Sequence, residues 1–410
     1  MTAPTLQVNP TRLLQRIASL GACGALSGGG VSRLALTDAD AQGRAELLRQ
    51  MRELDMEIRI DPVGNIFGIH AGVEDAVVMM GSHIDTVSTG GLYDGTLGVI
   101  AGLEVVACLK DAGIRPRHPV VVAAFTNEEG ARYAPDMLGS LVYSGVMDVQ
   151  DAYRITGCDG SVLGEELRRI GYCGMQSGPQ AIHAYVELHI EQGPVLEDRG
   201  LNIGIVTGVQ GISWTEITVE GRSAHAGTTP MRLRHDAGLA AAYITMGLSD
   251  MVARMGPEQL ATVGALSLAP NLVNVVASRA VMTVDLRNPD NTALCAAEST
   301  LAKLMGEAAT RYGVNVSHRT LARFEPVPFT STLVDTIEAT ARKMDLSCMR
   351  LYSGAGHDAQ MIAPIAPTAM IFVPSVAGIS HNIREYTHPD DIMNGANLLL
   401  RVVTDQAGIA

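Results

Sequence analysis

The sequence is poor in aromatic and in cationic residues. Its 410 residues include only 5 Phe and 1 Trp, so a surface on which nucleic-acid bases stack is not favoured. Lys and Arg together number 30 against 43 Asp and Glu, which gives a net charge of −13. A nucleic-acid partner would require a basic patch that meets the phosphate backbone. We therefore expect no nucleic-acid partner.

Paired cysteines, a secretory signal and a membrane-spanning run are also missing from the pattern. The six cysteines are scattered without a C-x-x-C pair, so we expect reduced thiols and no disulfide framework. The first residues lack the basic start and apolar stretch of a secretory signal. No apolar run reaches the ~18 residues that a membrane span needs. These features predict a soluble, cytoplasmic protein without a membrane partner.

The chain is instead rich in apolar residues and long enough for two domains. Hydrophobic residues make up 47% and charged residues 18%, as in globular proteins. Apolar strands at 77–80 and 119–125 flank an apolar helix at 96–112. Strand, helix and strand in this order are typical of an α/β fold with a doubly wound, mostly parallel sheet.

A different pattern begins at residue 212, where apolar and polar residues alternate as in half-exposed strands. Four strands and two helices fit within about 115 residues, which indicates a compact α+β domain. We predict an inserted domain at 212–326 with a four-stranded antiparallel sheet and two helices. Residues 1–211 and 327–410 would form the catalytic domain, with a last helix at 394–405.

The stretch VVMMGSHIDTV, residues 77–87, ends an apolar strand with His83 and Asp85. Side chains two apart on a strand point the same way, and the carboxyl end of such a strand is where α/β sheets bind ligands. An imidazole beside a carboxylate suits a metal ligand and its orienting partner. Alternatively, His83 is a core histidine and Asp85 caps a helix, and the isolated H-x-D pattern favours this reading.

Other strand ends carry further candidate ligands. The adjacent carboxylates of Glu128 and Glu129 repel each other, and an apolar pocket accepts both only with a cation. A solvated helix start is the alternative. Together with Asp94, His189 and His381, these residues supply the donors of a two-metal hydrolase. Such donors suit Zn, Mn, Co or Ni.

Eight segments, in order, resemble the motif blocks of the hydantoinase/carbamoylase family. This is the N-carbamoyl-L-amino-acid amidohydrolase and allantoate amidohydrolase branch of the dinuclear aminoacylase and metallopeptidase clan. The blocks span about residues 28–390, and HIEQGPVLE and SAHAGTTPM distinguish the branch from the peptidases proper. The segments are GSHIDTV, GGLYDGTLGV, FTNEEG, ELHIEQGPVLE, GRSAHAGTTPM, LVNVVASRAVMTVDLRNP, SGAGHDA and GISHNIREYT.

The resemblance implies two divalent metal ions per subunit, with zinc favoured and manganese, cobalt or nickel as alternatives. Glu128 would be the general base that activates water, and Asp85 would orient His83. The five metal ligands would be His83 and His189 for one ion and Glu129 and His381 for the other, with Asp94 bridging.

The resemblance also implies that the inserted domain is a lid through which two subunits form a homodimer. The substrate contacts would be Gln192, His225, Asn274, Arg287 and the backbone of Gly356. His225, delivered across the dimer, would stabilise the oxyanion, and Arg287 would bind a carboxylate. Without the resemblance, a turn residue is an equally good interpretation of His225. An isolated Arg in a strand, such as Arg287, is more often a surface ion-pair partner. We read His357 as adjacent to the pocket and Asp358 as a helix N-cap.

The implied reaction is hydrolysis of the carbamoyl C–N bond of N-carbamoyl-L-amino acids, which gives L-amino acid, CO2 and ammonia. Allantoate, ureidoglycine and β-ureidopropionate remain alternative substrates, and a dipeptidase or aminoacylase is a further alternative. A non-catalytic metal-binding scaffold is the alternative from a different class. It would need neither Glu128 nor His225, so their presence speaks against it.

Overall fold

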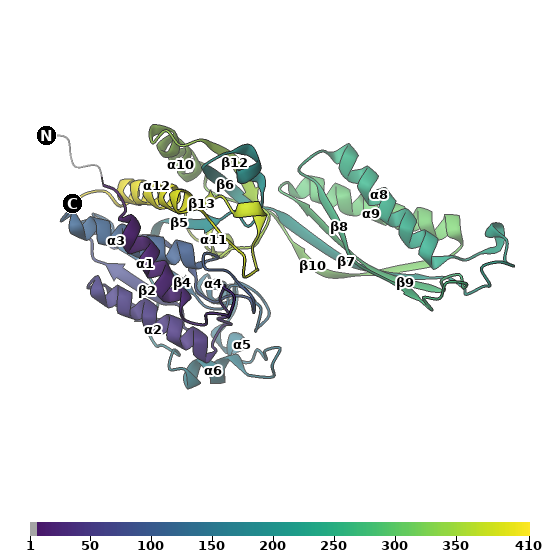
Figure 1. The fold of residues 1–410 in the computed structure, drawn as a ribbon, viewed down its shortest axis with the longest axis horizontal. Coiled ribbons are helices and arrows are strands. Elements are labelled where there is room, and N and C mark those ends of the chain that lie inside the picture. The colour runs from purple at the N-terminus through teal and green to yellow at the C-terminus, as the bar shows by residue number, and fades with distance from the viewer. Residues whose placement is uncertain (1–5) are drawn as a thin grey trace. The chain divides into compact units, whose positions relative to one another are not determined.

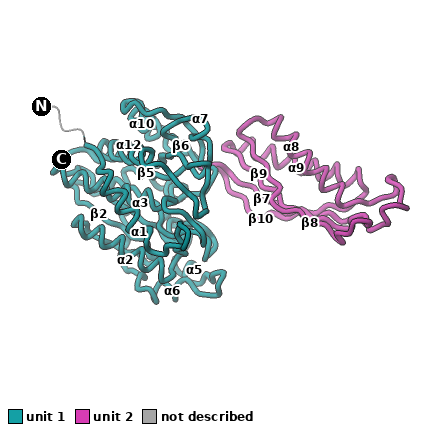
Figure 2. The backbone as a smooth tube through the Cα atoms, viewed as in Figure 1, with its two compact units in different colours: residues 1–208, 328–410 teal, residues 209–327 magenta. Residues whose placement is uncertain are grey.

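The computed structural model describes residues 6–410, which fold as two compact units (Figures 1 and 2). One unit runs to Gly208 and resumes at Pro328, and the other is Val209–Val327. The predicted fold class is confirmed: a mixed, mostly parallel α/β sheet is accompanied by an inserted four-stranded antiparallel sheet with two helices.

The large sheet is built around four parallel strands, in the order β4, β3, β5 and β13. These strands consist mainly of aliphatic residues and are almost entirely buried, as expected where helices cover both faces. Strands β1 and β2 pair antiparallel as a hairpin, and β2 pairs antiparallel with β4. The strands are β1 (Glu57–Ile60), β2 (Ile66–His70), β3 (Val77–His83), β4 (Val120–Phe125), β5 (Ile182–Ile190), β6 (Ile203–Val209), β11 (Val327–Pro328), β12 (Cys348–Ser353) and β13 (Thr368–Val373).

Helix α3 (Thr96–Asp111) is buried along nearly its whole length and packs against three strands of the sheet and two helices. The last helix, α12 (Pro389–Ala407), begins earlier than the predicted residue 394. Pro389 occupies the first turn, where a missing N–H costs nothing, and two aspartates there favour the helix start. The other helices are α1 (Pro10–Gly21), α2 (Asp38–Glu53), α4 (Leu138–Tyr143), α5 (Val149–Tyr153), α6 (Leu163–Arg169), α7 (Val195–Arg199), η2 (Val376–Gly378), α10 (Ser331–Lys343) and α11 (Asp358–Ile362).

The inserted unit is an antiparallel sheet in the order β10-β7-β9-β8, with two long helices packed on one face. Its core is aliphatic, with Ile217, Leu248 and Met282 among its members. The elements are β7 (Gly211–Glu220), η1 (Met231–Leu233), α8 (Ala237–Met255), β8 (Leu260–Ala269), β9 (Arg279–Asn288), α9 (Asn291–Tyr312) and β10 (Asn315–Phe324).

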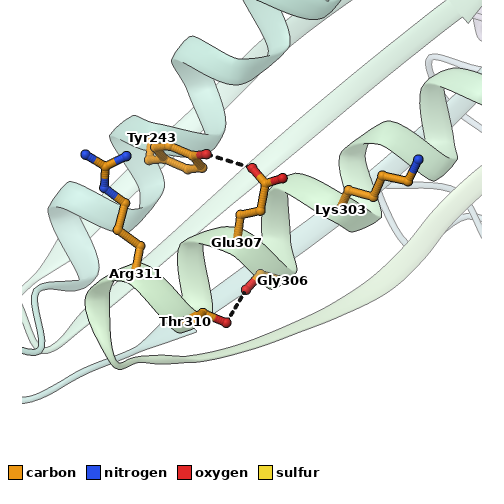
Figure 3. A pocket seen from close by; sticks show the side chains of 6 residues that line it. All are labelled: Tyr243, Lys303, Gly306, Glu307, Thr310 and Arg311. Atoms are coloured by element: carbon orange, nitrogen blue, oxygen red, sulfur yellow. Dashed lines mark hydrogen bonds between the residues drawn. The ribbon is translucent and has the colours of Figure 1, made fainter.

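A shallow hollow lies on the outer side of α8 and α9, and several of the side chains that line it contact one another (Figure 3). The Tyr243 hydroxyl donates to Glu307 at 2.7 Å, and the Arg311 guanidinium lies 5.4 Å from the Tyr243 ring centre. Lys303 also lines the hollow, and all of its lining residues belong to the inserted unit. Within residues 6–410, no helix is long and apolar enough to cross a membrane.

Candidate metal centre

The candidate ligands follow the ends of the parallel strands. β3 ends at His83, β4 ends at Phe125 shortly before Glu128 and Glu129, and β5 carries His189 one residue before its end. His83 lies opposite Phe125 in the register of β3 and β4, so these two strands end together. The sheet therefore presents imidazole and carboxylate groups at the edge where α/β folds bind ligands.

His83, Asp94 and His189 form the first cluster, with one ligand atom of each within 4.8 Å of the others. Asp94 Oδ1 lies 3.7 Å from His83 Nε2 and 3.2 Å from His189 Nε2. Nδ1 of each histidine donates to a backbone carbonyl at 2.9 Å, that of Asp85 for His83 and that of Ile190 for His189. Because a carbonyl only accepts, the neutral form of each ring carries its lone pair on Nε2, and Nε2 of His189 also accepts the Gly95 N–H at 3.1 Å.

Asp94, Glu129 and His381 form the second cluster at the same separation. His381 Nε2 lies 3.4 Å from Asp94 Oδ2 and 3.2 Å from Glu129 Oε2. Asp94 therefore turns one carboxylate oxygen toward each cluster. His381 is 51% exposed and has a φ of 52°, in the left-handed region that few non-glycine residues adopt.

Glu128 and Asp85 lie beside the first cluster. Glu128 Oε2 is 3.3 Å from His83 Nε2. The Asp85 carboxylate accepts the N–H groups of Glu128 at 3.2 Å and Glu129 at 3.3 Å, and it stays 4.0 Å from His83 Nδ1. Asp85 thus contacts the His83 ring through its backbone carbonyl, while its carboxylate holds the backbone of the two glutamates.

Burial and mutual charge shift the ionisation of the site. Burial chiefly raises the pKa of Glu128 and of Glu129 well above the ordinary value. Burial of Asp94 acts in the same direction, but contacts with His189 and His83 hold its pKa well below the usual range. Burial opposes a charged His83, yet Glu128 and Asp94 raise its pKa well above the ordinary value. A divalent cation would relieve the crowding of carboxylates, and imidazoles with Nε2 lone pairs fit such an ion.

Three supporting side chains were not predicted in this form. Glu385, 5% exposed, accepts the backbone N–H of Asp94 at 3.1 Å, and the Ser380 hydroxyl donates to Asp94 Oδ2 at 2.8 Å. Burial, followed by the charge of Asp94, raises the pKa of Glu385 to about 7. Gln192, predicted as a substrate contact, donates Nε2 to Asp94 Oδ2 at 2.9 Å. The carboxylate four residues after His381 in the sequence was the available signal for Glu385.

His357 lies against the first cluster, its ring centre 4.6 Å from that of His189. Gly356 therefore precedes a residue that contacts the site. The prediction that Asp358 is a helix N-cap is wrong, because His357 is the N-cap of α11 and Asp358 is its first residue. The Asp358 carboxylate turns inward and accepts a hydrogen bond from the Ser140 hydroxyl at 2.6 Å. Helix α11 begins inside the core, so the Asp358 carboxylate accepts from the buried Ser140 hydroxyl and not from a backbone N–H group of the helix.

In the inserted unit, His225 and Asn274 lie side by side and are both exposed. The Ala226 N–H donates to the Asn274 carbonyl at 3.0 Å. His225 Nδ1 accepts the N–H groups of Gly227 at 3.1 Å and Thr228 at 3.3 Å. His225 is thus the turn residue of the alternative reading. This contact also places the proton of the neutral ring on Nε2, which becomes a donor.

Arg287 lies at the other end of the inserted sheet. Its Nε and Nη2 donate to the Asp285 carboxylate at 2.9–3.1 Å, which is the ion pair of the alternative reading. Arg287 pairs with Ile212 near the start of β7, and the ladder continues for eight further positions to Glu220. At 3.3 Å per residue, His225 and Arg287 are separated by about 26 Å or more along the strands. One inserted unit does not bring them together.

The fold and the clustered imidazole and carboxylate groups indicate a candidate metal-dependent hydrolase. Comparison with known proteins identifies its family. The family model "Peptidase family M20/M25/M40" matches residues 79–405. The chain is 41% identical to the N-carbamoyl-L-amino-acid amidohydrolase of Rhizobium meliloti, over 100% of both chains. It is 35% identical to the allantoate amidohydrolase of Escherichia coli, over 93% of this chain and 94% of that protein.

A solved structure agrees with the sequence comparison. The crystal structure of a hydantoinase/carbamoylase family amidase from Burkholderia ambifaria matches with a TM-score of 0.95 and 41% identity, over 99% of both chains. The chain therefore belongs to the hydantoinase/carbamoylase amidases within peptidase family M20/M25/M40. It is an amidohydrolase of that family.

Proposed function

We propose that the protein hydrolyses N-carbamoyl-L-amino acids to L-amino acid, CO2 and ammonia at a centre of two metal ions. The observation that carries the proposal is Asp94, whose two carboxylate oxygens face two separate imidazole-containing clusters while Glu128 lies beside one of them. The similarity to the R. meliloti enzyme over the full chain supports the substrate class. The balanced reaction consumes one water per carbamoyl group.

His83, His189 and Asp94 would hold one ion, and Glu129, His381 and the other oxygen of Asp94 the second. When bound, the ions would supply a Lewis acid for the substrate carbonyl and would make water more acidic. Zinc is favoured by the mixed imidazole and carboxylate donors, and manganese, cobalt or nickel are the alternatives.

Glu128 would be the general base. Its carboxylate lies at the first cluster, is 8% exposed, and is held in direction by the backbone contact with Asp85. Burial raises the pKa of Glu128, so the group would take a proton from water and pass it to the leaving nitrogen near neutral pH. Asp85, through its carbonyl, would keep the His83 ring in the orientation that turns Nε2 to the metal.

Gln192 and Gly356 would contact the substrate from the same unit. The Gln192 side chain donates to Asp94, and its Oε1 is buried with no hydrogen-bond partner among the described residues. A buried acceptor without a partner carries a free-energy cost that a ureido N–H group would remove. Asp285 would hold the guanidinium plane of Arg287 for a bidentate contact with the substrate carboxylate.

His225 and Asn274 would reach the substrate from a second copy of the chain, and the protein would be a homodimer. The separation of His225 from Arg287 within one inserted unit is too large for one small substrate to span. Strand β8 offers the interface, because it is an edge strand without charged residues and exposes Leu266 at 49% and Leu268 at 40%. A long uncharged edge is a template for pairing with another chain.

An ammonia-release screen tests the proposal. Chelator-treated protein, reloaded in turn with Zn, Mn, Co or Ni, would be offered N-carbamoyl-L-amino acids, allantoate, ureidoglycine and β-ureidopropionate, with N-formyl and N-acetyl amino acids as controls. We expect metal-dependent ammonia release, greatest with N-carbamoyl-L-amino acids. Greatest release from allantoate would favour the activity of the E. coli relative. Release of free amino acid from N-acetyl substrates alone, without ammonia, would indicate an aminoacylase. If no substrate gave ammonia or free amino acid, the metal-binding scaffold would be the remaining alternative.

A further inference from the structure

Glu385 connects two segments that are remote in the sequence. Its Oε1 accepts the N–H groups of Tyr93 at 3.0 Å and Asp94 at 3.1 Å. Its Oε2 lies 3.2 Å from the Ser380 hydroxyl, whose single proton is shared with the nearer Asp94 Oδ2 at 2.8 Å. The side chain is nearly buried, at 5% exposed. One carboxylate therefore holds the loop that carries Asp94 against the loop that carries His381.

The backbone approach at this point depends on Gly91. A Cβ atom on Gly91 would lie 2.1 Å from Glu385 Oε1 and 2.2 Å from its Cδ. The φ angle of Gly91 is not positive, so its backbone conformation does not require glycine. The close contact with Glu385 does. The sequence thus leaves space at Gly91 for this one carboxylate.

The two segments meet at the second cluster. The Ser380 hydroxyl, which contacts Glu385, also lies 2.8 Å from Asp94 Oδ2, and that oxygen is 3.4 Å from His381 Nε2. His381 keeps a left-handed φ of 52°, an unfavourable conformation for a non-glycine residue that surrounding contacts must maintain. The geometry of Asp94 relative to His381 is therefore set by groups around them that are not themselves ligands.

We propose that Glu385 is a positioning residue that fixes the distance between Asp94 and His381 and thereby the affinity of the second metal position. This inference rests on the proposed two-metal function. Glu385 acts through the backbone of Asp94 and the hydroxyl of Ser380. Partners of this kind, which hydrogen-bond to ligand-bearing groups, are worth about 10- to 100-fold in metal affinity.

Titration of the chelator-treated full chain with Co2+, followed by its d–d absorption, tests the role without reference to turnover. Glu385→Ala removes the carboxylate, Glu385→Gln keeps one acceptor oxygen, and Gly91→Ala displaces the carboxylate without removing it. We expect Kd for the second Co2+ to rise about 10- to 100-fold in Glu385→Ala and Gly91→Ala, and less in Glu385→Gln. Kd for the first Co2+ should change much less, and the spectrum of the second should change in shape.

Glu104→Gln is the matched control. Glu104 is also a fully buried carboxylate that accepts a backbone N–H from a remote segment, that of Asn9 at 2.8 Å, but it contacts neither cluster. We expect Glu104→Gln to lower Tm and to leave both Co2+ affinities unchanged. Equal weakening of both ions, or of neither, in Glu385→Ala and Gly91→Ala would overturn the positioning role, as would weakening in Glu104→Gln. A wild-type chain that binds fewer than two Co2+ would overturn the two-metal function itself.

Discussion

The two units of the chain bury different kinds of side chain. In the unit that runs to Gly208 and resumes at Pro328, many ionisable groups are buried, both at the metal centre and away from it, as Arg33, Arg44 and Asp61 illustrate. Within Val209–Val327 no Asp, Glu, Lys, Arg or His is buried, and the core is aliphatic. Among the predicted site residues, His83 and His189 of the larger unit are buried and His225 of the inserted unit is exposed, whereas His381 of the larger unit is also exposed.

The two units therefore hold their predicted functional residues in place by different means. Ligands that must stay within a few tenths of an ångström are fixed by buried networks of hydrogen bonds, so their substitution affects chemistry and stability together. Exposed residues on a stable aliphatic scaffold serve function with little effect on the fold. The contrast predicts which substitutions change activity alone, and the following experiments test it in order of expected effect.

Glu128→Gln should reduce turnover by about 10²- to 10⁴-fold, because the amide cannot take the proton of water. Metal content after gel filtration should stay at the wild-type level, since Glu128 is not among the proposed ligands. Glu129→Gln, one residue away, should instead lose metal. Ammonia release and metal analysis of both variants provide the measurement. Turnover of Glu128→Gln close to wild type would remove Glu128 as the base.

His225→Ala should lower kcat by about 10²- to 10³-fold, as expected for loss of an oxyanion donor. Because His225 is exposed and lies in the inserted unit, Tm and metal content should not change. His318→Ala, an exposed histidine of β10 in the same unit, is the control and should keep wild-type kcat. A fall in Tm that accounts for the lost activity would break the division between the units.

Leu266→Lys should convert the proposed dimer to a monomer, because it places a charge on the exposed edge strand β8. Sedimentation velocity would measure the assembly state, and activity should fall in parallel if His225 comes from the second copy. Ala302→Lys, at an exposed position of α9, is the control for added charge. A dimeric Leu266→Lys protein would exclude β8 as the interface.

Asp61→Asn should change the pH dependence of stability of the larger unit. Burial raises the pKa of Asp61 to about 6, although hydrogen bonds from Asn65 and Val63 oppose the shift. The folded chain therefore keeps a proton on Asp61 that the unfolded chain releases, so stability falls as pH rises from about 4 to 6. The difference in free energy of unfolding between wild type and variant should change by about 1–3 kcal/mol across this range. Denaturant titrations of both proteins at pH 4.5 and 7 measure it, and parallel curves would contradict it.

The sequence best predicts the site residues that lie at or just after the end of an apolar strand. His83 follows a continuous apolar run, and the position of Glu128 follows from the next such run, so local pattern and family resemblance lead to the same residues. The carboxylate that a backbone N–H meets depends on contacts between remote segments. For this reason the sequence did not show that the Asp85 carboxylate holds the N–H groups of Glu128 and Glu129.

The sequence predicts least where a polar group turns inward. Asp358 has the residue type and position of a helix N-cap, but α11 starts inside the core and the carboxylate meets Ser140. Glu385 lies four residues after His381, but nothing near it in the sequence identifies its partners Tyr93 and Asp94, which lie almost three hundred residues away. A pattern within one segment cannot encode a contact whose other half is elsewhere in the chain.

The distance along the chain between Asp94 and Ser380, 286 residues, has a consequence for synthesis. At 5–20 residues per second, a ribosome needs roughly 15–60 s to pass from one to the other. The first cluster is complete in sequence once His189 has been made, whereas the second waits for His381. The whole inserted unit, Val209–Val327, emerges in between. A nascent chain thus has the residues of the first cluster well before those of the second, and the smaller unit has time to fold before the larger unit is complete.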